Sequence, residues 1–198
     1  MTVNMKKALQ KEINIVELLQ PETRLEHQLI EVAEFRKGLF WGKPRFGHPE
    51  GMVVYHIKDV LENINQLDVE DEVRENLRII AYCHDTFKYL EEQIGKGPDR
   101  SNHHSILARK FMEDYISDQD VLDVIEYHDE AYYCWRLQHL YNRKEEGTER
   151  MNAMLDILDK NIQLFYLFFK CDTRTGDKIQ APLQWFETAV ANIEVVEL

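Results

Sequence analysis

Hydrophobic residues follow a helical spacing along almost the whole of this chain. They recur at steps of three and four residues, the pattern of an amphipathic helix with one buried face. Pro182 opens the last such stretch, where Leu183, Phe186 and Val190 form an apolar stripe. The pattern predicts helices over residues 5–19, 22–37, 51–66, 70–90, 102–116, 118–142 (with an interruption left open), 148–173, and from Pro182 onward. No stretch alternates for long enough to predict a strand, so the expected fold class is all-α.

A stretch dense in turn-forming residues separates the second and third predicted helices. Its glycines and prolines, within residues 38–51, are Gly38, Gly42, Pro44, Gly47, Pro49 and Gly51. Such density is typical of an ordered but irregular connection, and a long loop in a compact domain is often functional. We expect it to form part of the rim of an active site. The alternative is a plain entry into the next core helix.

The composition is that of an ordinary globular chain with an acidic balance. Of the 198 residues, 44% are hydrophobic and 30% are charged, and the net charge is −12. This charge argues against a nucleic-acid polymer as the main partner, because such binding depends on clustered Lys and Arg. A small phosphorylated substrate stays compatible with it, because bound cations can reverse the sign of a local field.

The chain carries no sign of a membrane segment or of export. Its longest apolar run, residues 162–169, is far shorter than the roughly 18 residues that a membrane helix needs. The first residues have acids and amphipathic spacing instead of the apolar centre of a signal peptide. Cys83, Cys134 and Cys171 form no CxxC pair, and their apolar surroundings predict buried, reduced thiols. We therefore expect a cytoplasmic protein with no membrane partner.

The dipeptide His84-Asp85 is the first candidate for chemistry. It ends an apolar helical run, residues 77–83. Further imidazoles and one acid stand on other apolar helices, before and after it, at His56, His103, His104, His128 and Asp172. A series of this kind is typical of a metal site in a helical protein, because coordination is one of the few ways to satisfy a buried charge.

Lys88 follows the dipeptide by about one helical turn. On a continuous helix it shares a face with both His84 and Asp85. A cation there could hold a phosphate oxygen or stabilise charge on a leaving group. The alternative is an ordinary helical ion pair with Glu91 or Glu92.

The ordered set resembles the HD domain superfamily of metal-dependent phosphohydrolases. Its pattern is a His, then a His-Asp pair, then an Asp, on separate helices of an all-α bundle. His56, His84-Asp85 and Asp172 match it in order. Many members also carry a Lys three residues after the first Asp, as Lys88 is here, usually within His-Asp-Ile-Gly-Lys. This chain reads His-Asp-Thr-Phe-Lys, without the glycine.

A subset of that family has two more histidines between the pair and the last acid, and these help to bind a second metal ion. His128 falls where the second is expected, and either His103 or His104 falls at the first, with His104 slightly favoured. The resemblance implies one or two divalent ions, with Asp85 bridging two because a carboxylate has two oxygens. Mixed His and carboxylate ligands suit Mn, Fe, Co, Ni or Zn, and the identity of the ion, with Mg also among the candidates, is left open.

Other polar residues are weaker candidates for substrate binding. His48 and Glu50 could line the pocket from the loop. Arg174 and Lys178, just beyond Asp172, could bind an anionic substrate, or be solvated charges after a helix end. Three aromatic residues could stack on a nucleobase, but they could equally pack in a core or a subunit interface: Tyr132, Tyr133 and Trp135.

The resemblance implies a metal-dependent phosphohydrolase that acts on a nucleotide or another small phosphorylated metabolite, with Asp85 and Lys88 catalytic. Two alternatives stay open: a di-iron oxygenase of the same fold, and a non-catalytic helical module with a structural metal. We expect a single domain over residues 1–198, with N-terminal helices and loop (1–46), a metal-binding core (47–175) and a C-terminal helix (176–198). The oligomeric state, a homodimer included, is left open.

Overall fold

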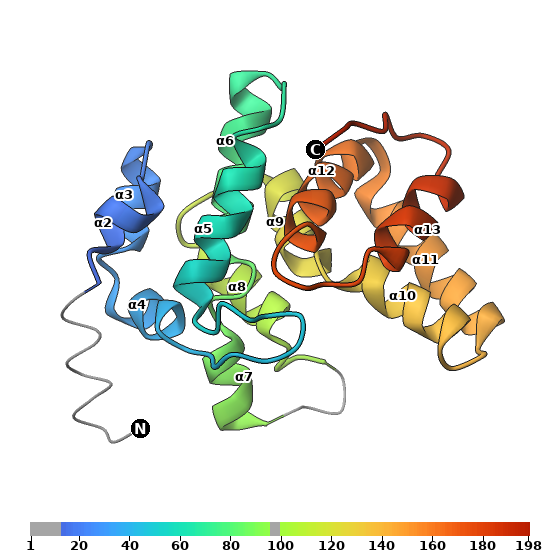
Figure 1. The fold of residues 1–198 in the computed structure, drawn as a ribbon, viewed down its shortest axis with the longest axis horizontal. Helices are drawn as coiled ribbons and strands as arrows, with labels where there is room; N and C mark the ends of the chain where they lie inside the picture. The colour runs from blue at the N-terminus through green and yellow to red at the C-terminus, as the bar shows by residue number, and fades with distance from the viewer. Residues whose placement is uncertain (1–12, 96–99) are drawn as a thin grey trace.

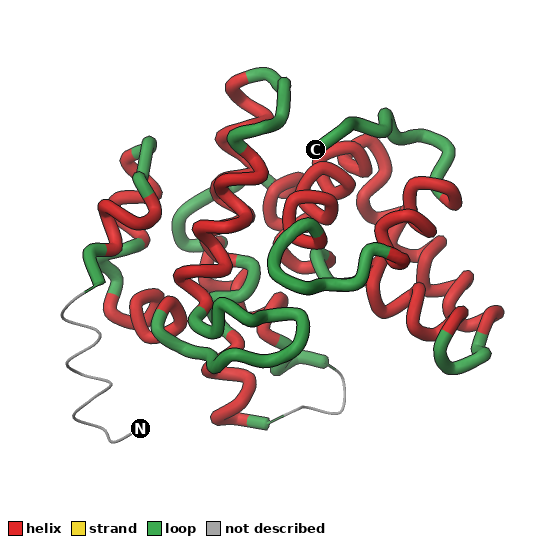
Figure 2. The backbone as a smooth tube through the Cα atoms, viewed as in Figure 1, coloured by secondary structure: helices red, strands yellow, loops and turns green. Residues whose placement is uncertain are grey.

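The computed structural model describes residues 13–95 and 100–198, which fold almost entirely into helices (Figure 1). Two isolated β-bridges, Gly42 to Met52 and Arg45 to His48, are the extended pairings within those ranges. The all-α prediction is confirmed (Figure 2). The helices are α2 (Ile15–Leu19), α3 (Arg24–Leu29), α4 (Ala33–Leu39), α5 (Val53–Ile64), α6 (Asp71–Cys83), α7 (Lys88–Ile94), α8 (His104–Met112), α9 (Gln119–Tyr127), α10 (Glu130–His139), α11 (Lys144–Leu158), the short 3-10 helix η1 (Asp159–Asn161), α12 (Ile162–Thr173) and α13 (Ala181–Ala189).

Several predicted helices are each two shorter ones. Breaks fall within the predicted segments 22–37, 70–90, 118–142 and 148–173, of which the third was expected to be interrupted. Between α6 and α7 the chain makes a turn, with backbone bonds of 3.2 Å from Thr86 N to Cys83 O and from Lys88 N to Asp85 O. After α11, Asp159 takes a left-handed φ of 36°. The expectation that Lys88 continues one helix with His84 and Asp85 is therefore wrong.

At the N-terminal end, Asn14 caps α2 by accepting a hydrogen bond from Glu17 N. Of the helix predicted over 5–19, residues 15–19 are helical, residues 13 and 14 precede the start of α2, and residues 5–12 lie outside the described ranges.

The centre of the core is built from α5, α6 and α12, which pack against one another (Figure 1). Each contributes fully buried apolar side chains, among them Val54, Ile57, Ile80 and Phe168. α12 also contacts α11 and α13, so this helix is apolar on nearly every side. Because these three helices are fixed by packing, the polar groups at their ends are held rigidly in place.

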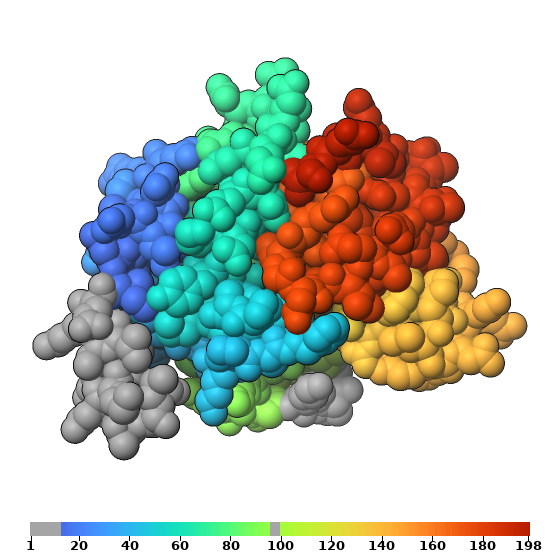
Figure 3. Space-filling view, in the orientation of Figure 1, coloured from blue at the N-terminus to red at the C-terminus, as the bar shows by residue number. Residues whose placement is uncertain are grey.

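The remaining helices close the two ends of this core. α10 and α11 form a helical hairpin, and α13 packs on α10 and α12. The apolar stripe predicted for the last helix is confirmed, since Leu183, Phe186 and Val190 are buried. In Figure 3 the long loop before α5 runs across one face toward the segment before α13. Gly47 N donates to Asp177 Oδ1 at 2.6 Å, which joins these two segments.

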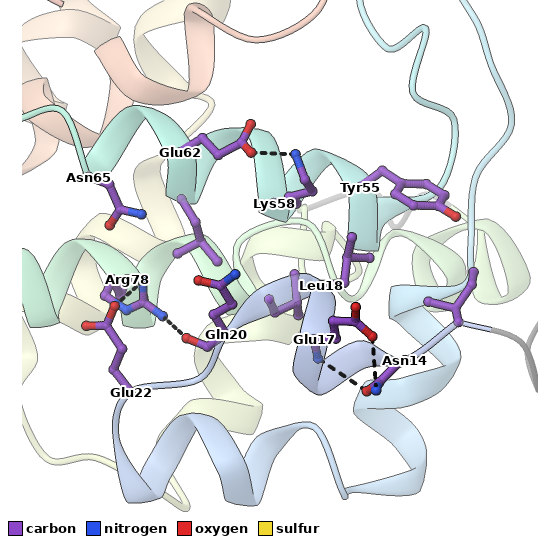
Figure 4. A pocket seen from close by; sticks show the side chains of 13 residues that line it. Asn14, Glu17, Leu18, Gln20, Glu22, Tyr55, Lys58, Glu62, Asn65 and Arg78 are labelled. Atoms are coloured by element: carbon purple, nitrogen blue, oxygen red, sulfur yellow. Dashed lines mark hydrogen bonds and ion pairs between the residues drawn. The ribbon is translucent and has the colours of Figure 1, made fainter.

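The N-terminal helices dock on the core through a buried ion pair. Arg78 of α6 is 2% exposed and Glu26 of α3 is fully buried. Arg78 Nε donates to Glu26 Oε1 at 2.8 Å and Arg78 Nη2 donates to Glu26 Oε2 at 3.0 Å. Beside this pair α2, α5 and α6 enclose a cavity of about 500 Å³ (Figure 4), whose wall includes Lys58 and Glu62.

All three cysteines are free and buried, as predicted. Within the described ranges, no helix is both long enough and apolar enough to cross a membrane.

Candidate metal centre

The ends of separate helices bring the predicted ligands to one place. His56 lies near the start of α5, and His104 is the first residue of α8. His84 and His128 directly follow the last residues of α6 and α9, and Asp172 lies near the end of α12. All four histidines are at most 4% exposed. Helix ends suit this task because several can point inward at one spot while their packed bodies diverge.

A first cluster joins His56, His84 and Asp172. The Nε2 atoms of the two histidines are 3.3 Å apart. Asp172 Oδ1 lies 2.8 Å from His56 Nε2 and 3.7 Å from His84 Nε2. These side chains come from α5, the end of α6 and α12, so residues more than a hundred positions apart meet here.

A second cluster joins His104 and His128 with Asp85. The Nε2 atoms of these two histidines are 3.4 Å apart, and Asp85 Oδ1 is 3.6 Å from each. The two ring pairs have the same arrangement, since each has a centroid separation of 5.3 Å and an interplanar angle of 61°. His104, and not its neighbour His103, therefore faces the centre. His103 caps α8 through Ser105 N.

Asp85 lies between the two clusters. Its Oδ2 is 3.7 Å from His84 Nε2 and 3.9 Å from His56 Nε2, whereas its Oδ1 faces His104 and His128. One carboxylate thus presents one oxygen to each histidine pair. This is the arrangement that a bridging ligand requires.

The hydrogen bonds of the histidine rings fit a bound divalent cation. For His84, His104 and His128, Nδ1 lies within hydrogen-bond distance of an acceptor, which favours the proton on Nδ1 and leaves the lone pair of Nε2 directed into the centre. Two such lone pairs facing each other repel unless a positive charge lies between them. The Nδ1 acceptors are Ala81 O for His84 (2.9 Å), Ile125 O for His128 (2.9 Å) and Glu91 Oε2 for His104 (2.7 Å). His56 Nδ1 instead lies 3.5 Å from Thr175 Oγ1 and 3.4 Å from Glu50 Oε1.

The electrostatics of the centre favour the ligand forms of most of these groups. Burial alone would raise the pKa of Asp85 and of Asp172, but the ammonium groups of Lys88 and Lys178 hold both pKa values well below the usual range. Burial lowers the pKa of His84 to about 3, so its ring is neutral. Both carboxylates and this imidazole are therefore already deprotonated at neutral pH.

His128 differs from His84 in this respect. Burial would lower its pKa, but the charges of Asp129 and Asp85 raise it above the ordinary value. Its Nε2 lies near the carboxylates of Asp85 and Asp129, which favour a positive charge there. Either a proton or a metal ion could supply that charge.

Lys88 pairs with the shared carboxylate. Its Nζ donates to Asp85 Oδ2 at 2.5 Å, and the alternative ion pair with Glu91 or Glu92 does not form. Glu91 accepts from His104, and Glu92 accepts from Trp41 Nε1 at 2.6 Å. Although the turn after α6 breaks the expected helix, it still brings Lys88 to the centre.

Two adjoining cavities open beside the clusters, with volumes of about 290 Å³ and 530 Å³. The smaller reaches Asp85, His128 and Asp172 and has apolar walls that include Phe46, Phe169 and Ile179. The larger reaches His104 and has Trp41, His103 and Tyr133 on its walls. The residues that line both are Arg45, His48, Lys88, Asp129 and Tyr132.

Of the residues predicted to bind substrate from outside the metal ligands, some line these cavities and one does not. His48 lines both, and Lys178 lines the smaller one, where its Nζ donates to Asp172 Oδ1 at 2.8 Å. Arg174 does not reach them: it ends α12 with an exposed side chain and is not among the described residues that line either cavity. The chain turns back after α12, so the cation four residues later reaches the centre instead.

Some of the candidates from the loop and among the aromatic residues also reach the centre or its cavities, and others do not. Glu50 lies between two histidines, with its Oε1 2.9 Å from His48 Nδ1 and 3.4 Å from His56 Nδ1. Tyr132 and Tyr133 reach the cavities, whereas Trp135 stacks on His139. The loop over residues 38–51 therefore contributes to the rim of these cavities through Arg45, Phe46 and His48.

Two residues at the centre, Arg45 and Asp129, were not selected as candidates from the sequence. Arg45 lines both cavities with its guanidinium 5.9 Å from the Trp41 ring centroid. Asp129 Oδ2 lies 3.3 Å from His104 Nε2 and 3.6 Å from His128 Nε2. A signal for Asp129 existed, since His128-Asp129 is a second His-Asp dipeptide at a helix end. Nothing in the pattern of the loop distinguishes Arg45.

Comparison with protein families identifies the class of this chain. The family model described as HD domain matches residues 53–158, more than half of the chain. The protein therefore belongs to the HD domain family, a superfamily of the metal-dependent hydrolase type. Searches of curated proteins and of solved structures give no match. The matched segment holds His56, His84 and Asp85, whereas Asp172 lies beyond it and joins the centre through the fold.

Proposed function

We propose that this protein is a phosphohydrolase that uses one or two divalent metal ions to cleave a nucleotide or another small phosphorylated metabolite. The observation that carries the proposal is the position of Asp85, with one oxygen toward each of two histidine pairs beside an open cavity. Family membership supports metal-dependent hydrolysis as the class of chemistry. The substrate class, a nucleotide or another small phosphorylated metabolite, is the part of the proposal that neither the position of Asp85 nor the family membership determines.

The residues of the centre have distinct tasks in this reaction. His56, His84 and Asp172 would hold one ion, and His104 and His128 a second, with Asp85 shared. Bound ions would lower the pKa of a water molecule and neutralise charge on the phosphoryl group. Lys88, next to Asp85 Oδ2, would donate a hydrogen bond to a phosphoryl oxygen.

The cavity walls supply the rest of the substrate site. Arg45 forms no ion pair with any residue that the structure describes, so its guanidinium is available to an anionic group. Burial lowers the pKa of His48 to about 4, so His48 is neutral and would bind substrate by a hydrogen bond instead of by charge. The cavity volumes suit a small substrate, near the lower part of the roughly 300–1,000 Å³ range of such sites.

Metal analysis combined with a phosphate-release screen tests the proposal. The purified protein is assayed over nucleotides and other phosphate esters with added Mn²⁺, Co²⁺ or Ni²⁺. We expect metal-dependent release of phosphate, and we expect Asp85→Ala to abolish both metal retention and turnover. Asp156→Ala, on the exposed face of α11, is the matched control and should change neither. Turnover that persists in Asp85→Ala would overturn the mechanism.

Oxidation by a di-iron centre is the second candidate. Histidine pairs about a shared carboxylate also suit iron, so the donor set alone is compatible with it. Iron content and oxygen uptake separate the two, because a phosphohydrolase releases phosphate under anaerobic conditions. A purely structural metal is less well supported, because structural sites are closed, whereas cavities reach both clusters here.

A further inference from the structure

The chain places two His-Asp dipeptides in the same structural setting. His84 and His128 each follow the last residue of a helix with nearly the same backbone angles, φ −49° and ψ −43° against φ −52° and ψ −34°. Each Nδ1 is 2.9 Å from the carbonyl oxygen three residues earlier. Each is followed by an aspartate, Asp85 or Asp129. The first aspartate is the shared carboxylate of the centre, and the second has no assigned role.

Asp129 directs its carboxylate toward the second histidine pair. Its Oδ2 lies 3.3 Å from His104 Nε2 and 3.6 Å from His128 Nε2. Asp172 Oδ1 lies at 2.8 Å and 3.7 Å from the corresponding atoms of His56 and His84. Each histidine pair therefore has a carboxylate of its own in addition to its share of Asp85.

An ordinary structural role does not account for this side chain. Asp129 is the N-cap residue of α10, a position where an aspartate usually accepts hydrogen bonds from the first backbone N–H groups. Its side chain makes no such bond among the described residues. The next acid shows the contrast, because the carboxylate of Glu130 is held in ion pairs by Arg100 and Arg150. Asp129 also lines both cavities, so it borders the space where a substrate would lie.

We propose that Asp129 is the terminal carboxylate ligand of the second metal ion, as Asp172 is of the first. The inference rests on the proposed function, in that the centre must bind divalent cations at all. It makes the centre two matched sites, each with two imidazoles, one oxygen of Asp85 and one further carboxylate. Each site then offers both nitrogen and oxygen ligands, a set that suits divalent transition-metal ions.

Manganese binding tests the inference without any substrate. The apo protein is equilibrated with Mn²⁺, and bound metal is counted by elemental analysis for the wild type, Asp129→Asn, Asp172→Asn and the control Asp156→Asn. We expect two ions per chain in the wild type and the control. We expect one in Asp129→Asn and one in Asp172→Asn, with affinity at the altered site lower by at least tenfold, on the order of losses seen for ligand-supporting residues. Electron paramagnetic resonance should show coupled Mn²⁺ in the wild type and a single-ion signal in both variants.

The outcomes separate the inference from the proposed function. Two ions bound at wild-type affinity in Asp129→Asn would overturn the role of Asp129 and leave metal-dependent hydrolysis intact. A wild type that binds one ion, unchanged by Asp129→Asn, would do the same. A wild type that binds none would overturn both. If Asp129→Asn fails to fold by circular dichroism, Asp129→Ser is measured instead, because serine is a good N-cap residue for α10.

Discussion

Lys88 has the positive charge nearest to the shared carboxylate, with its Nζ 2.5 Å from Asp85 Oδ2. If it contacts the phosphoryl group, Lys88→Met should lower turnover by roughly 10²- to 10³-fold, the usual effect of removing one donor to developing charge. Metal content should be unchanged, because the ligands are left intact. The exposed residue Lys110 provides the control variant Lys110→Met. Unchanged turnover in Lys88→Met would reduce Lys88 to an ion-pair partner of Asp85.

The three thiols should be inert in the folded protein. Burial raises the pKa of Cys134 and Cys171 to about 12, and it raises that of Cys83 as well. The thiolate is the reactive form, so it is scarce at pH 8. We expect no fast reaction with a disulfide reagent in the native state and three reacting thiols in guanidinium chloride. Fast labelling of any native thiol would show that its helix opens readily.

At the scale of elements, α4 fixes the turn that presents Asp85. Gly38 in α4 lies against this turn so closely that an added Cβ would be 1.8 Å from Thr86 O. Replacing a helical glycine by alanine usually stabilises a helix by about 0.5–1 kcal/mol. Here we expect Gly38→Ala to destabilise the protein by about 1–3 kcal/mol, the cost of overpacking.

Denaturant unfolding of Gly38→Ala should show this loss of stability together with a lower metal content, because the turn holding Asp85 must move. Lys37→Ala is the matched control, since Lys37 is exposed on the same helix. If Gly38→Ala proved as stable as the control, the close contact between α4 and the turn would be wrong.

The sequence predicts the long amphipathic elements well and their interruptions poorly. The stripe Leu183, Phe186 and Val190 identifies α13 because a period of 3.6 persists through it. The turn after α6 has no glycine or proline to announce it, and the apolar spacing continues through it. A local hydrogen bond from Thr86 Oγ1 to Tyr82 O at 2.7 Å and the close approach of Gly38 in α4 to Thr86 hold this turn in place.

In the candidate site, too, the sequence predicts some residues and not others. The resemblance to the HD pattern identifies His56, His84, Asp85 and Asp172 by their order along the chain, and the apolar run beside each of them predicts that it is buried. Loop residues follow no period, so the sequence could not select Arg45 from its neighbours or decide between Arg174 and Lys178. Those choices depend on how the segments after α12 and before α5 fold back over the centre, which the bond from Gly47 to Asp177 fixes.

At the scale of the molecule, the centre ties together helices from most of the chain. Each of five helices has one of the candidate metal ligands at or near one of its ends: α5, α6, α8, α9 and α12. Without a cation, the facing lone pairs of the imidazole nitrogens oppose this convergence, whereas Lys88 and Lys178 already balance the charge of Asp85 and Asp172. A bound ion would therefore join elements that the hydrophobic core alone brings near one another, and its binding energy would add to that of folding.

Metal removal should accordingly lower the thermal stability of the whole protein. An ion that binds only the folded state stabilises it by about 2.7 kcal/mol at a hundredfold excess over its Kd. For a chain of this length each kcal/mol shifts Tm by roughly 2–4 °C, so one ion should raise Tm by about 5–10 °C and two by more. Scanning calorimetry with Mn²⁺ and then with excess EDTA measures the difference. Asp85→Asn should lose the shift, because both clusters share that carboxylate, and Asp156→Asn should keep it. Equal Tm values with Mn²⁺ and with EDTA in the wild type would mean that the helix ends meet without any cation to hold them.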